Sequence, residues 1–278
     1  MNVKPFVKWV GGKRQLLAKI TPLIPEAFTR YIEPFTGGGA VFFSLSKRLQ
    51  DGHIPAWLND INPELVNAYQ IVRDRPDALL ADLHTHIHSK DYFLSIRSLD
   101  RQVGGLSSLT PVQRASRFIY LNRTAFNGLY RVNAKGQFNV PFGRYKNPAI
   151  AEADTIYSCS KALQKVTISC SSFDKLLPQT NEGDFIYLDP PYIPLNKTSY
   201  FTSYSQTGFG HTEQQKLADL VRDMDKRGVR FLASNAYVPE LNNLYSGFTI
   251  IEVQATRAIN ANKDGRHAIS EALITNIL

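Results

Sequence analysis

The chain of 278 residues has only two cysteines, Cys159 and Cys170, which excludes a disulfide framework and a four-thiolate zinc site. It has no apolar run near the ~18 residues that a membrane-spanning helix needs. Its first residues lack the apolar stretch of about 7–15 residues that marks a secretory signal. We find no internal repeat and no low-complexity linker. These absences predict a cytoplasmic protein that does not bind a membrane.

Metal-binding patterns are also scarce. His84, His86 and His88 lie close together in the sequence. On a helix only His84 and His88 would share a face, and no carboxylate or thiolate completes a zinc-like site there. We therefore expect no metal.

What is present is a large apolar fraction and an uneven positive charge. The chain is 43% hydrophobic, with 16 Phe and 13 Tyr, which suffices for a packed core. Its length suggests one large domain, or one domain with a sizeable insertion. The net charge is +8, and residues 96–147 carry all of it, with Asp100 as their only acid. Nine basic residues lie in that stretch: Arg97, Arg101, Arg114, Arg117, Arg123, Arg131, Lys135, Arg144 and Lys146.

A run of charge is often only a solvated face. Here the arginines alternate with aromatic residues, among them Tyr120, Phe126, Tyr130, Phe138 and Tyr145. Planar cations beside aromatic rings suit phosphates, base edges and unstacked bases. We therefore expect double-stranded DNA or another nucleic acid as the partner.

Strand and helix patterns alternate along most of the chain. Strands are predicted at 31–33, 56–59, 166–169, 185–188, 229–232, 248–253 and 268–277. Helices are predicted at 40–49, from residue 62, across 76–124 and at 213–226, with a β-hairpin at 130–141. This alternation predicts an α/β fold with a mostly parallel sheet, whose last two strands form an antiparallel pair. The predicted domains are a catalytic domain, 1–75 and 150–278, and an inserted recognition domain of helices and a hairpin, 76–149.

Three predicted helices begin at recognisable capping signals. Asn62 precedes Pro63, and Thr110 precedes Pro111; in both pairs a capping side chain is followed by a proline at the first helical position. The third helix is predicted to begin at a capping box formed by Thr212 and Gln215.

The first chemistry-bearing motif is Glu33-Pro-Phe-Thr-Gly-Gly-Gly-Ala40, between a predicted strand and a predicted helix. Glycines there allow a ligand to approach the backbone and the helix N-terminus. Asp60, at the end of the next strand, is placed to accept both hydroxyls of a ribose. A tight structural turn with a surface aspartate is the alternative. The motif departs from the G-x-G-x-x-G pattern of dinucleotide-binding proteins. This departure favours an adenosine-bearing ligand without a pyrophosphate. The candidate cofactor residues here are Glu33, Phe35, Gly37, Gly39 and Asp60.

The second motif is Asp189-Pro190-Pro191-Tyr192, directly after a strongly apolar strand. In open α/β sheets, ligands bind beyond the carboxyl ends of the strands. The aspartate and a proline carbonyl can each accept one N–H of an exocyclic amine, while the tyrosine ring stacks on the base. Two acceptors favour a pyramidal nitrogen whose lone pair can attack a methyl group. The alternative for such a tetrapeptide is a proline turn with a core tyrosine.

The third motif runs from Phe6 to Lys13. It is compatible with an N-terminal strand whose tryptophan packs in the core. It is equally compatible with a second wall of the cofactor pocket, in which Trp9, Gly11 and Lys13 would lie beside the ligand.

Taken together, the motifs resemble those of the Dam family of DNA adenine-N6 methyltransferases, in the α-type order and most like its DpnM-type modification methylases. The segments are F-V-K-W-V-G-G-K, E-P-F-T-G-G-G, N-D-I-N, Y-L-N-R-T-A-F-N-G-L-Y-R, F-N-V-P-F-G-R-Y-K and D-P-P-Y-I-P-L. The resemblance covers essentially the whole chain. It implies a Rossmann-like domain, S-adenosyl-L-methionine as cofactor, and methylation of adenine within GATC by base flipping.

The resemblance also implies roles for single residues. Trp9, Lys13, Asp60 and Asp189 match cofactor-contacting positions, and Asp189, Pro190 and Tyr192 match the catalytic tetrapeptide. Phe126 and Asn127 match the pair that enters the duplex beside the flipped adenine. DNA-recognition positions are matched by Lys8, Leu129, Arg131, Pro141, Arg144 and Tyr145.

Three alternatives stay open at this point. Cytosine-N4 methyltransferases more often have serine in place of Asp189, and glutamine methyltransferases usually have asparagine. A DNA-binding relative without activity would not need the intact tetrapeptide. We expect an enzyme that is a monomer or a weak dimer. The motifs do not choose between restriction–modification, repair-strand marking and a phage role.

Overall fold

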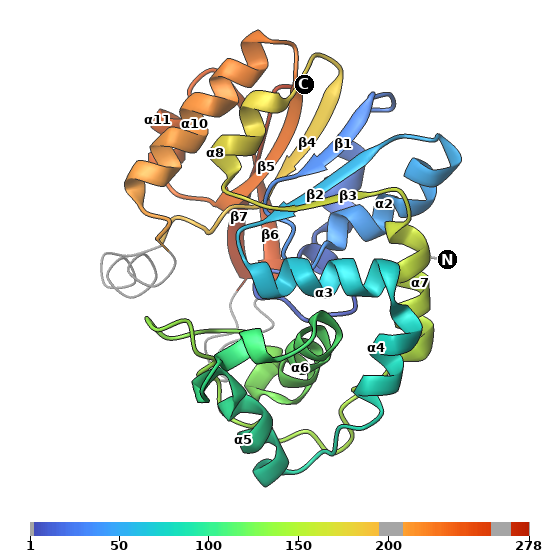
Figure 1. Cartoon of the computed structure of the whole chain (residues 1–278). Coiled ribbons are helices and arrows are strands. Elements are labelled where there is room, and N and C mark those ends of the chain that lie inside the picture. The colour runs from blue at the N-terminus through green and yellow to red at the C-terminus, as the bar shows by residue number, and fades with distance from the viewer. Residues whose placement is uncertain (1–2, 195–207, 257–267, 278) are drawn as a thin grey trace. The chain divides into compact units, whose positions relative to one another are not determined.

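A computed structural model describes residues 3–194, 208–256 and 268–277, and the chain divides into two compact units (Figure 1). The first unit holds residues 1–12, 37–50 and 62–170, and the second holds 13–36, 51–61 and 171–278. The predicted recognition domain, 76–149, lies entirely within the first unit. The predicted domain boundaries themselves stay a prediction.

The second unit is built on a mostly parallel sheet, as predicted. Its strands lie in the order β2-β1-β4-β5-β7-β6. β2, β1, β4 and β5 are parallel neighbours, whereas β7 pairs antiparallel with both β5 and β6. The bounds are β1 (Arg30–Glu33), β2 (Ala56–Asp60), β4 (Asp184–Leu188), β5 (Arg230–Ala236), β6 (Thr249–Thr256) and β7 (Ala268–Thr275).

Helices of the same unit cover one face of this sheet. β4 is buried along its whole length, which is why it reads as an unbroken apolar run. Apolar side chains from the strands and from three helices form a single core cluster. These helices are α8 (Phe173–Leu176), α10 (His211–Lys226) and α11 (Glu240–Leu244); the unit also has α1 (Leu17–Ile20) and 3₁₀ turns at Lys13–Gln15, Thr21–Leu23 and Leu177–Gln179.

The predicted start of α10 was wrong. The helix begins at His211, and the Glu213 carboxylate accepts a hydrogen bond from the backbone N–H of Gly210 at 2.7 Å. The Thr212–Gln215 spacing therefore does not form the cap. Instead, the Glu213 carboxylate in the first turn supplies the acceptor for the backbone N–H of Gly210.

The first unit is mainly helical. Asn62 caps α3 through the N–H groups of Glu64 and Leu65, and Thr110 caps α6 in a capping box with Gln113, as predicted. The helical pattern across 76–124 resolves into three α-helices with short turns between them. The elements are α2 (Ala40–Asp51), α3 (Pro63–Asp74), α4 (Pro76–Leu83), α5 (Lys90–Ser98), α6 (Pro111–Thr124), α7 (Ala153–Leu163), β3 (Thr167–Cys170) and 3₁₀ turns at Leu99–Arg101, Gly105–Ser108 and Phe126–Gly128.

The predicted hairpin at 130–141 forms an antiparallel turn without strands. One isolated bridge joins Val132 and Phe138, and the turn lies at the predicted Lys135–Gly136. The side chain of Asn133 accepts hydrogen bonds from the N–H groups of Lys135 and Gln137. Such local side-chain bonds compete with a strand ladder, which explains why the pairing stays short.

A buried ion pair organises the base of this turn. Arg117 on α6 donates to Asp100 at 2.8 Å, and both side chains are nearly buried, at 4% and 5% exposure. Asp100 also accepts from Arg101 and, at 2.7 Å, from the backbone N–H of Phe138. Asp100, the single acid of the basic stretch, thus binds two arginines and one backbone N–H, and the two arginines have a structural role.

Replacing Asp100 by alanine should destabilise the protein by about 3–5 kcal/mol, because it leaves the buried Arg117 guanidinium without its carboxylate. Asp91, an exposed acid in the first turn of α5, is the matched control, and its replacement should cost less than about 1 kcal/mol. Guanidinium unfolding monitored by circular dichroism measures both. Equal effects would mean that the Asp100 cluster contributes nothing beyond a surface ion pair.

Candidate active site

Three acids lie at one edge of the sheet in the second unit. Glu33 and Asp60 are the last residues of β1 and β2, and Asp189 directly follows β4. These three strands are parallel neighbours, so their carboxyl ends meet at the same edge. This is the edge at which open α/β sheets bind ligands.

Asp189 is held by two neighbours from different elements. The hydroxyl of Ser234, on β5, donates to its Oδ1 at 2.9 Å. The ammonium of Lys13 lies 2.8 Å from the same oxygen, with its side chain only 4% exposed. A buried ammonium is stable only where a carboxylate or other acceptors compensate its charge. Sequence reasoning predicted Lys13 and Asp189 but not Ser234.

Tyr192 completes the same cluster. The Lys13 ammonium lies 4.7 Å from the centre of its ring, in a cation–π arrangement. The Tyr192 hydroxyl donates to Glu271 Oε2, on β7, at 2.6 Å. Burial, and then the nearby carboxylates of Asp189 and Glu271, raise the pKa of Tyr192 well above its usual value. The phenol therefore stays protonated and acts as a donor.

Two buried amides brace the backbone of the tetrapeptide. Gln214, on α10, donates to the carbonyl of Pro191 at 2.7 Å, and Asn235, on β5, accepts from the N–H of Ile193 at 2.9 Å. The two amides also bond each other, at 3.3 Å. The Pro191 carbonyl is therefore engaged with Gln214. Polar residues inside the buried strand β5 were the sequence signal that could have revealed this brace.

The other predicted cofactor residues of the second unit also lie at this edge. Glu33 is almost fully buried and accepts a hydrogen bond from the Tyr31 hydroxyl. Burial, and then the Glu33 carboxylate, raise the pKa of Tyr31 well above its usual value. Phe35 packs against Phe173 and Phe209, at ring-centre distances of 5.4 and 5.7 Å. A buried carboxylate and an aromatic ring beside the strand ends fit a ligand with a cationic amine and a planar base.

The first unit contains the remaining predicted cofactor residues, Trp9, Gly11, Gly37 and Gly39. The Phe6–Lys13 segment forms bends and turns, so the strand interpretation was wrong. The indole of Trp9 packs directly on the glycines: a Cβ at Gly37 would lie 2.6 Å from its Cδ1. Gly37 has φ +48°, a left-handed conformation that favours glycine. The other side of Trp9 stacks on Tyr130, with ring centres 6.2 Å apart.

Predicted DNA-binding residues from three segments meet within this unit. The Lys8 ammonium lies 4.5 Å from the centre of the Tyr145 ring. The buried side chain of Asn122, on α6, accepts from the Lys8 N–H and donates to the carbonyls of Lys8 and Gly128, all within 2.8–2.9 Å. Asn122 therefore ties the N-terminal segment to the turn after α6, a role that sequence reasoning missed.

The turn after α6 presents the pair predicted to enter the duplex. Phe126 is 45% exposed, and its N–H donates to the carbonyl of Pro141 at 2.9 Å. Asn127, also exposed, has φ +54°. Leu129 packs against the core of the unit. An exposed aromatic ring on a rigid turn is available for a contact with a partner.

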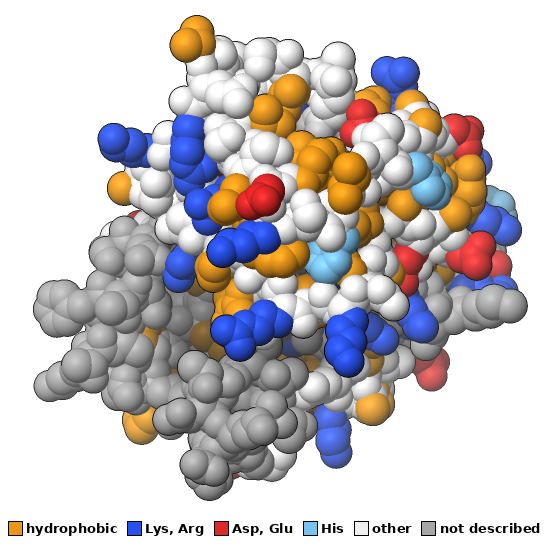
Figure 2. All heavy atoms as spheres, turned by 90° about the horizontal axis from the view of Figure 1, so that it is seen from below, with side chains coloured by type: hydrophobic (Ala, Val, Ile, Leu, Met, Phe, Trp, Pro, Cys, Tyr) orange, Lys and Arg blue, Asp and Glu red, His pale blue; other side chains and the backbone are white. Residues whose placement is uncertain are grey.

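The basic stretch divides into structural and exposed cations. Besides Arg101 and Arg117, Arg114 pairs with Glu64 and Arg123 with Glu152. These four are engaged inside the unit. Figure 2 shows other Lys and Arg side chains beside hydrophobic ones on the face seen from below, with few acids among them. The exposed basic residues of the stretch include Arg131, Lys135, Arg144 and Lys146.

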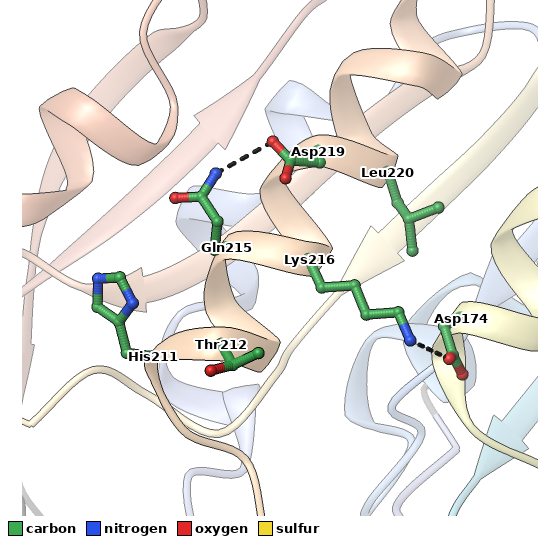
Figure 3. Close-up of a pocket in the computed structure, with 7 residues that line it drawn as sticks. All are labelled: Asp174, His211, Thr212, Gln215, Lys216, Asp219 and Leu220. Carbon is green, nitrogen blue, oxygen red and sulfur yellow. Dashed lines mark hydrogen bonds and ion pairs between the residues drawn. The ribbon is translucent and has the colours of Figure 1, made fainter.

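A separate hollow of about 900 Å³ lies on the solvent side of α10 (Figure 3). Its lining includes the ion pair between Lys216 and Asp174, and none of the predicted site residues.

Among the residues that the structure describes, no group of three His, Cys, Asp or Glu side chains could hold a metal ion. Within the same ranges, no helix has both the length and the apolar character needed to cross a membrane.

The mostly parallel α/β sheet, with acids at one edge and an Asp-Pro-Pro-Tyr loop after β4, has the layout expected of an α/β methyltransferase. Residues 9–259 match the model of the D12 class N6 adenine-specific DNA methyltransferase family, and the chain belongs to this family. The family resemblance is thereby confirmed: the family is that of adenine-specific DNA methyltransferases, and not of cytosine-N4 or glutamine methyltransferases.

Several curated relatives match over nearly their whole length. The type II methyltransferase M1.LlaDCHI of Lactococcus lactis subsp. cremoris is 44% identical over 99% of this chain and 96% of its own. The type II methyltransferase M.MjaIII of Methanocaldococcus jannaschii is 41% identical over 99% and 100%. A DNA adenine methylase of Escherichia coli strain K12 is 32% identical over 97% and 94%.

Replacing Gly37 by alanine should destabilise the protein by about 1–3 kcal/mol more than the same change at Gly136, because only Gly37 adds a steric clash to the strain of a positive φ. Gly136 has φ +73° and open space around it, which makes it the matched control. Unfolding midpoints measure the difference. In a Trp57→Phe background, Gly37→Ala should also shift the emission of Trp9; an unshifted emission would contradict the packing described above.

Proposed function

We propose that the protein transfers the methyl group of S-adenosyl-L-methionine to N6 of adenine in double-stranded DNA, within the sequence GATC, after flipping that base out of the duplex. One observation carries this proposal. The Lys13 ammonium lies 2.8 Å from Asp189 and 4.7 Å from the centre of the Tyr192 ring. A carboxylate and an aromatic face thus already hold an amine at the end of β4, as a receptor for the adenine amine requires.

In this proposal the catalytic residues act by positioning. Asp189 and the Pro190 carbonyl each accept one N–H of the adenine amine, which directs the nitrogen lone pair at the methyl carbon. When bound, S-adenosyl-L-methionine would supply a methyl group on a cationic sulfur; the sulfur would keep the electron pair of the broken bond and become neutral, and the methylated amine would release one proton to solvent. Tyr192 stacks on the base. The bound cofactor supplies an activated methyl group, so the protein needs mainly orientation and a site that excludes water.

The acidic edge supports the choice of cofactor. S-adenosyl-L-methionine carries a cationic methionyl amine, a ribose with two hydroxyls and an adenine. Asp60 at the end of β2 would accept the ribose hydroxyls, and the carboxylates of Glu33 and Asp189 complement positive charge. Phe35 offers an apolar face for the adenine. The roles of Trp9, Gly11, Gly37 and Gly39 stay predictions of the family resemblance.

We include base flipping in the proposal because of where N6 of adenine lies in duplex DNA. N6 of a paired adenine cannot reach Tyr192 while the base is stacked in the duplex. The exposed Phe126 and Asn127 would occupy the space beside the flipped base. Residues 76–149 would act as the recognition domain, with Lys8, Leu129, Arg131, Pro141, Arg144 and Tyr145 at the DNA. The cytoplasm is the proposed location of this activity, and the expected monomer or weak dimer stays a prediction.

Asp189→Ala should lower methyl transfer by about 10²–10³-fold, because it removes a preorganised acceptor of the reacting amine. Incorporation of radiolabelled methyl groups from S-adenosyl-L-methionine into a GATC duplex measures the rate. Asp174→Ala, an acid of the same unit that lies outside the proposed site, is the control and should keep the wild-type rate. If Asp189→Ala keeps more than half of the activity, the proposed mechanism is wrong.

Arg131→Ala should lose about 1–3 kcal/mol of discrimination at one outer base pair of GATC, because an arginine can bind guanine O6 and N7 together. Arg144→Ala should weaken binding to all DNA sequences alike. It should also reduce, by about one unit, the slope of the logarithm of the DNA association constant against the logarithm of salt concentration, as expected for a phosphate contact. Methylation rates on GATC and its single-base variants, measured for both mutants, compare the two roles. A proportional loss at every site in Arg131→Ala would assign that residue to the backbone.

A further inference from the structure

The hydrogen bond between Tyr192 and Glu271 joins the catalytic loop to a strand that the proposed mechanism does not use. Glu271 is on β7, where it pairs with Ala236 of β5 on one side and with Val253 of β6 on the other. A residue in register with two neighbouring strands has a fixed backbone. Its carboxylate oxygen lies 2.6 Å from the Tyr192 hydroxyl, so it fixes the outer end of that ring.

The inner end of the same ring is fixed independently. Gln214 holds the carbonyl of Pro191, and Asn235 holds the N–H of Ile193, so the backbone on both sides of Tyr192 is bonded to buried amides. With the backbone held, rotation about the side-chain bonds is the freedom that the ring retains. The bond to Glu271 holds the hydroxyl in one place before any substrate is present, and because a phenol O–H prefers to lie in the plane of its ring, it also favours one ring plane.

The chemistry of the pair suits this task. The tyrosine hydroxyl lies near two carboxylates in a mostly buried place, and these surroundings keep it protonated. A neutral phenol donating to a carboxylate makes a stronger and shorter hydrogen bond than two neutral groups do. Glu271 bonds the hydroxyl at the edge of the ring, whereas the Lys13 ammonium lies over one ring face.

We propose that Glu271 is a positioning residue of the methyltransferase: it holds the Tyr192 ring in the plane in which a flipped adenine stacks, without touching the adenine itself. This inference rests on the proposed function, because it assigns the stacking role to Tyr192. It adds a residue of the C-terminal strand pair to the site, and it makes the orientation of Tyr192 a property of the free protein.

The test compares Glu271→Ala, Glu271→Gln, Tyr192→Phe and the double variant Tyr192→Phe/Glu271→Ala in single-turnover methylation of a GATC duplex. Misplacing a stacked group by about 1 Å can lower a rate by about 100-fold, so we expect 10- to 100-fold losses in Glu271→Ala and in Tyr192→Phe. Glutamine keeps an acceptor oxygen, so Glu271→Gln should stay within about threefold of the wild type. The double variant should be no slower than the slower single variant, since both changes break the same bond.

A fluorescence measurement separates positioning from a merely structural role. With 2-aminopurine in place of the target adenine, a base stacked on Tyr192 is quenched, so the complex with Glu271→Ala should be brighter than the wild-type complex. The DNA concentration at half-maximal rate should stay within twofold. Glu252→Ala, an acid on the adjacent strand β6 of the same strand pair, is the control and should match the wild type in rate and brightness.

Two results would overturn the inference: a wild-type rate in Glu271→Ala, or losses that multiply in the double variant. If Glu271→Ala does not fold, Glu271→Leu fills the same space without an acceptor and should show the same slow, bright phenotype; a wild-type rate in that variant overturns the inference equally. Methyl incorporation by the unmodified protein is measured in the same series. Its absence would refute the proposed function, whereas wild-type activity with an unaffected Glu271→Ala would refute only the role of Glu271.

Discussion

The candidate site depends on the parallel pairing of β2, β1 and β4. Parallel neighbours end at the same edge of a sheet, so the acids that end β1 and β2 and the acid that follows β4 lie along one line. The strands themselves are buried and apolar, which leaves their ends as the place where polar groups can reach a ligand. A register shift of one residue in β4 would turn Asp189 to the opposite face of the sheet.

The loop after β4 is rigid because polar groups of other elements satisfy it. Ser234 and Asn235 reach it from β5, Gln214 from α10 and Glu271 from β7. Each of these groups is partly or fully removed from water, where an unpaired donor or acceptor is costly and a paired one is well ordered. The loop therefore presents Asp189 and Tyr192 in a defined geometry before a substrate arrives.

Net charge alone overstates how many basic residues are available at the surface that we propose to face DNA. The stretch 96–147 contains nine basic residues, but Arg101 and Arg117 hold the buried Asp100, and Arg114 and Arg123 pair with acids outside the stretch. A cation engaged in this way contributes to the fold and only weakly to the release of counterions from DNA. The exposed cations cluster instead in the turn region around 131–146, close in sequence to the exposed Phe126.

The sequence by itself determined the alternation of strands and helices, the caps at Asn62 and Thr110, and the Asp-Pro-Pro-Tyr motif that we propose to be catalytic, because these depend on local pattern and short-range hydrogen bonds. It also identified Lys13 and Asp189, although not that they pair. Only the tertiary structure decided which arginines are structural, that the 130–141 turn lacks strands, and that Gln214, Ser234, Asn235 and Glu271 surround the loop. Each of those partners is 23 to 79 residues in the chain from the loop residue that it bonds, and no periodicity encodes contacts over such distances. Packing of the strands and of α10 brings them together, and that packing is a property of the folded chain.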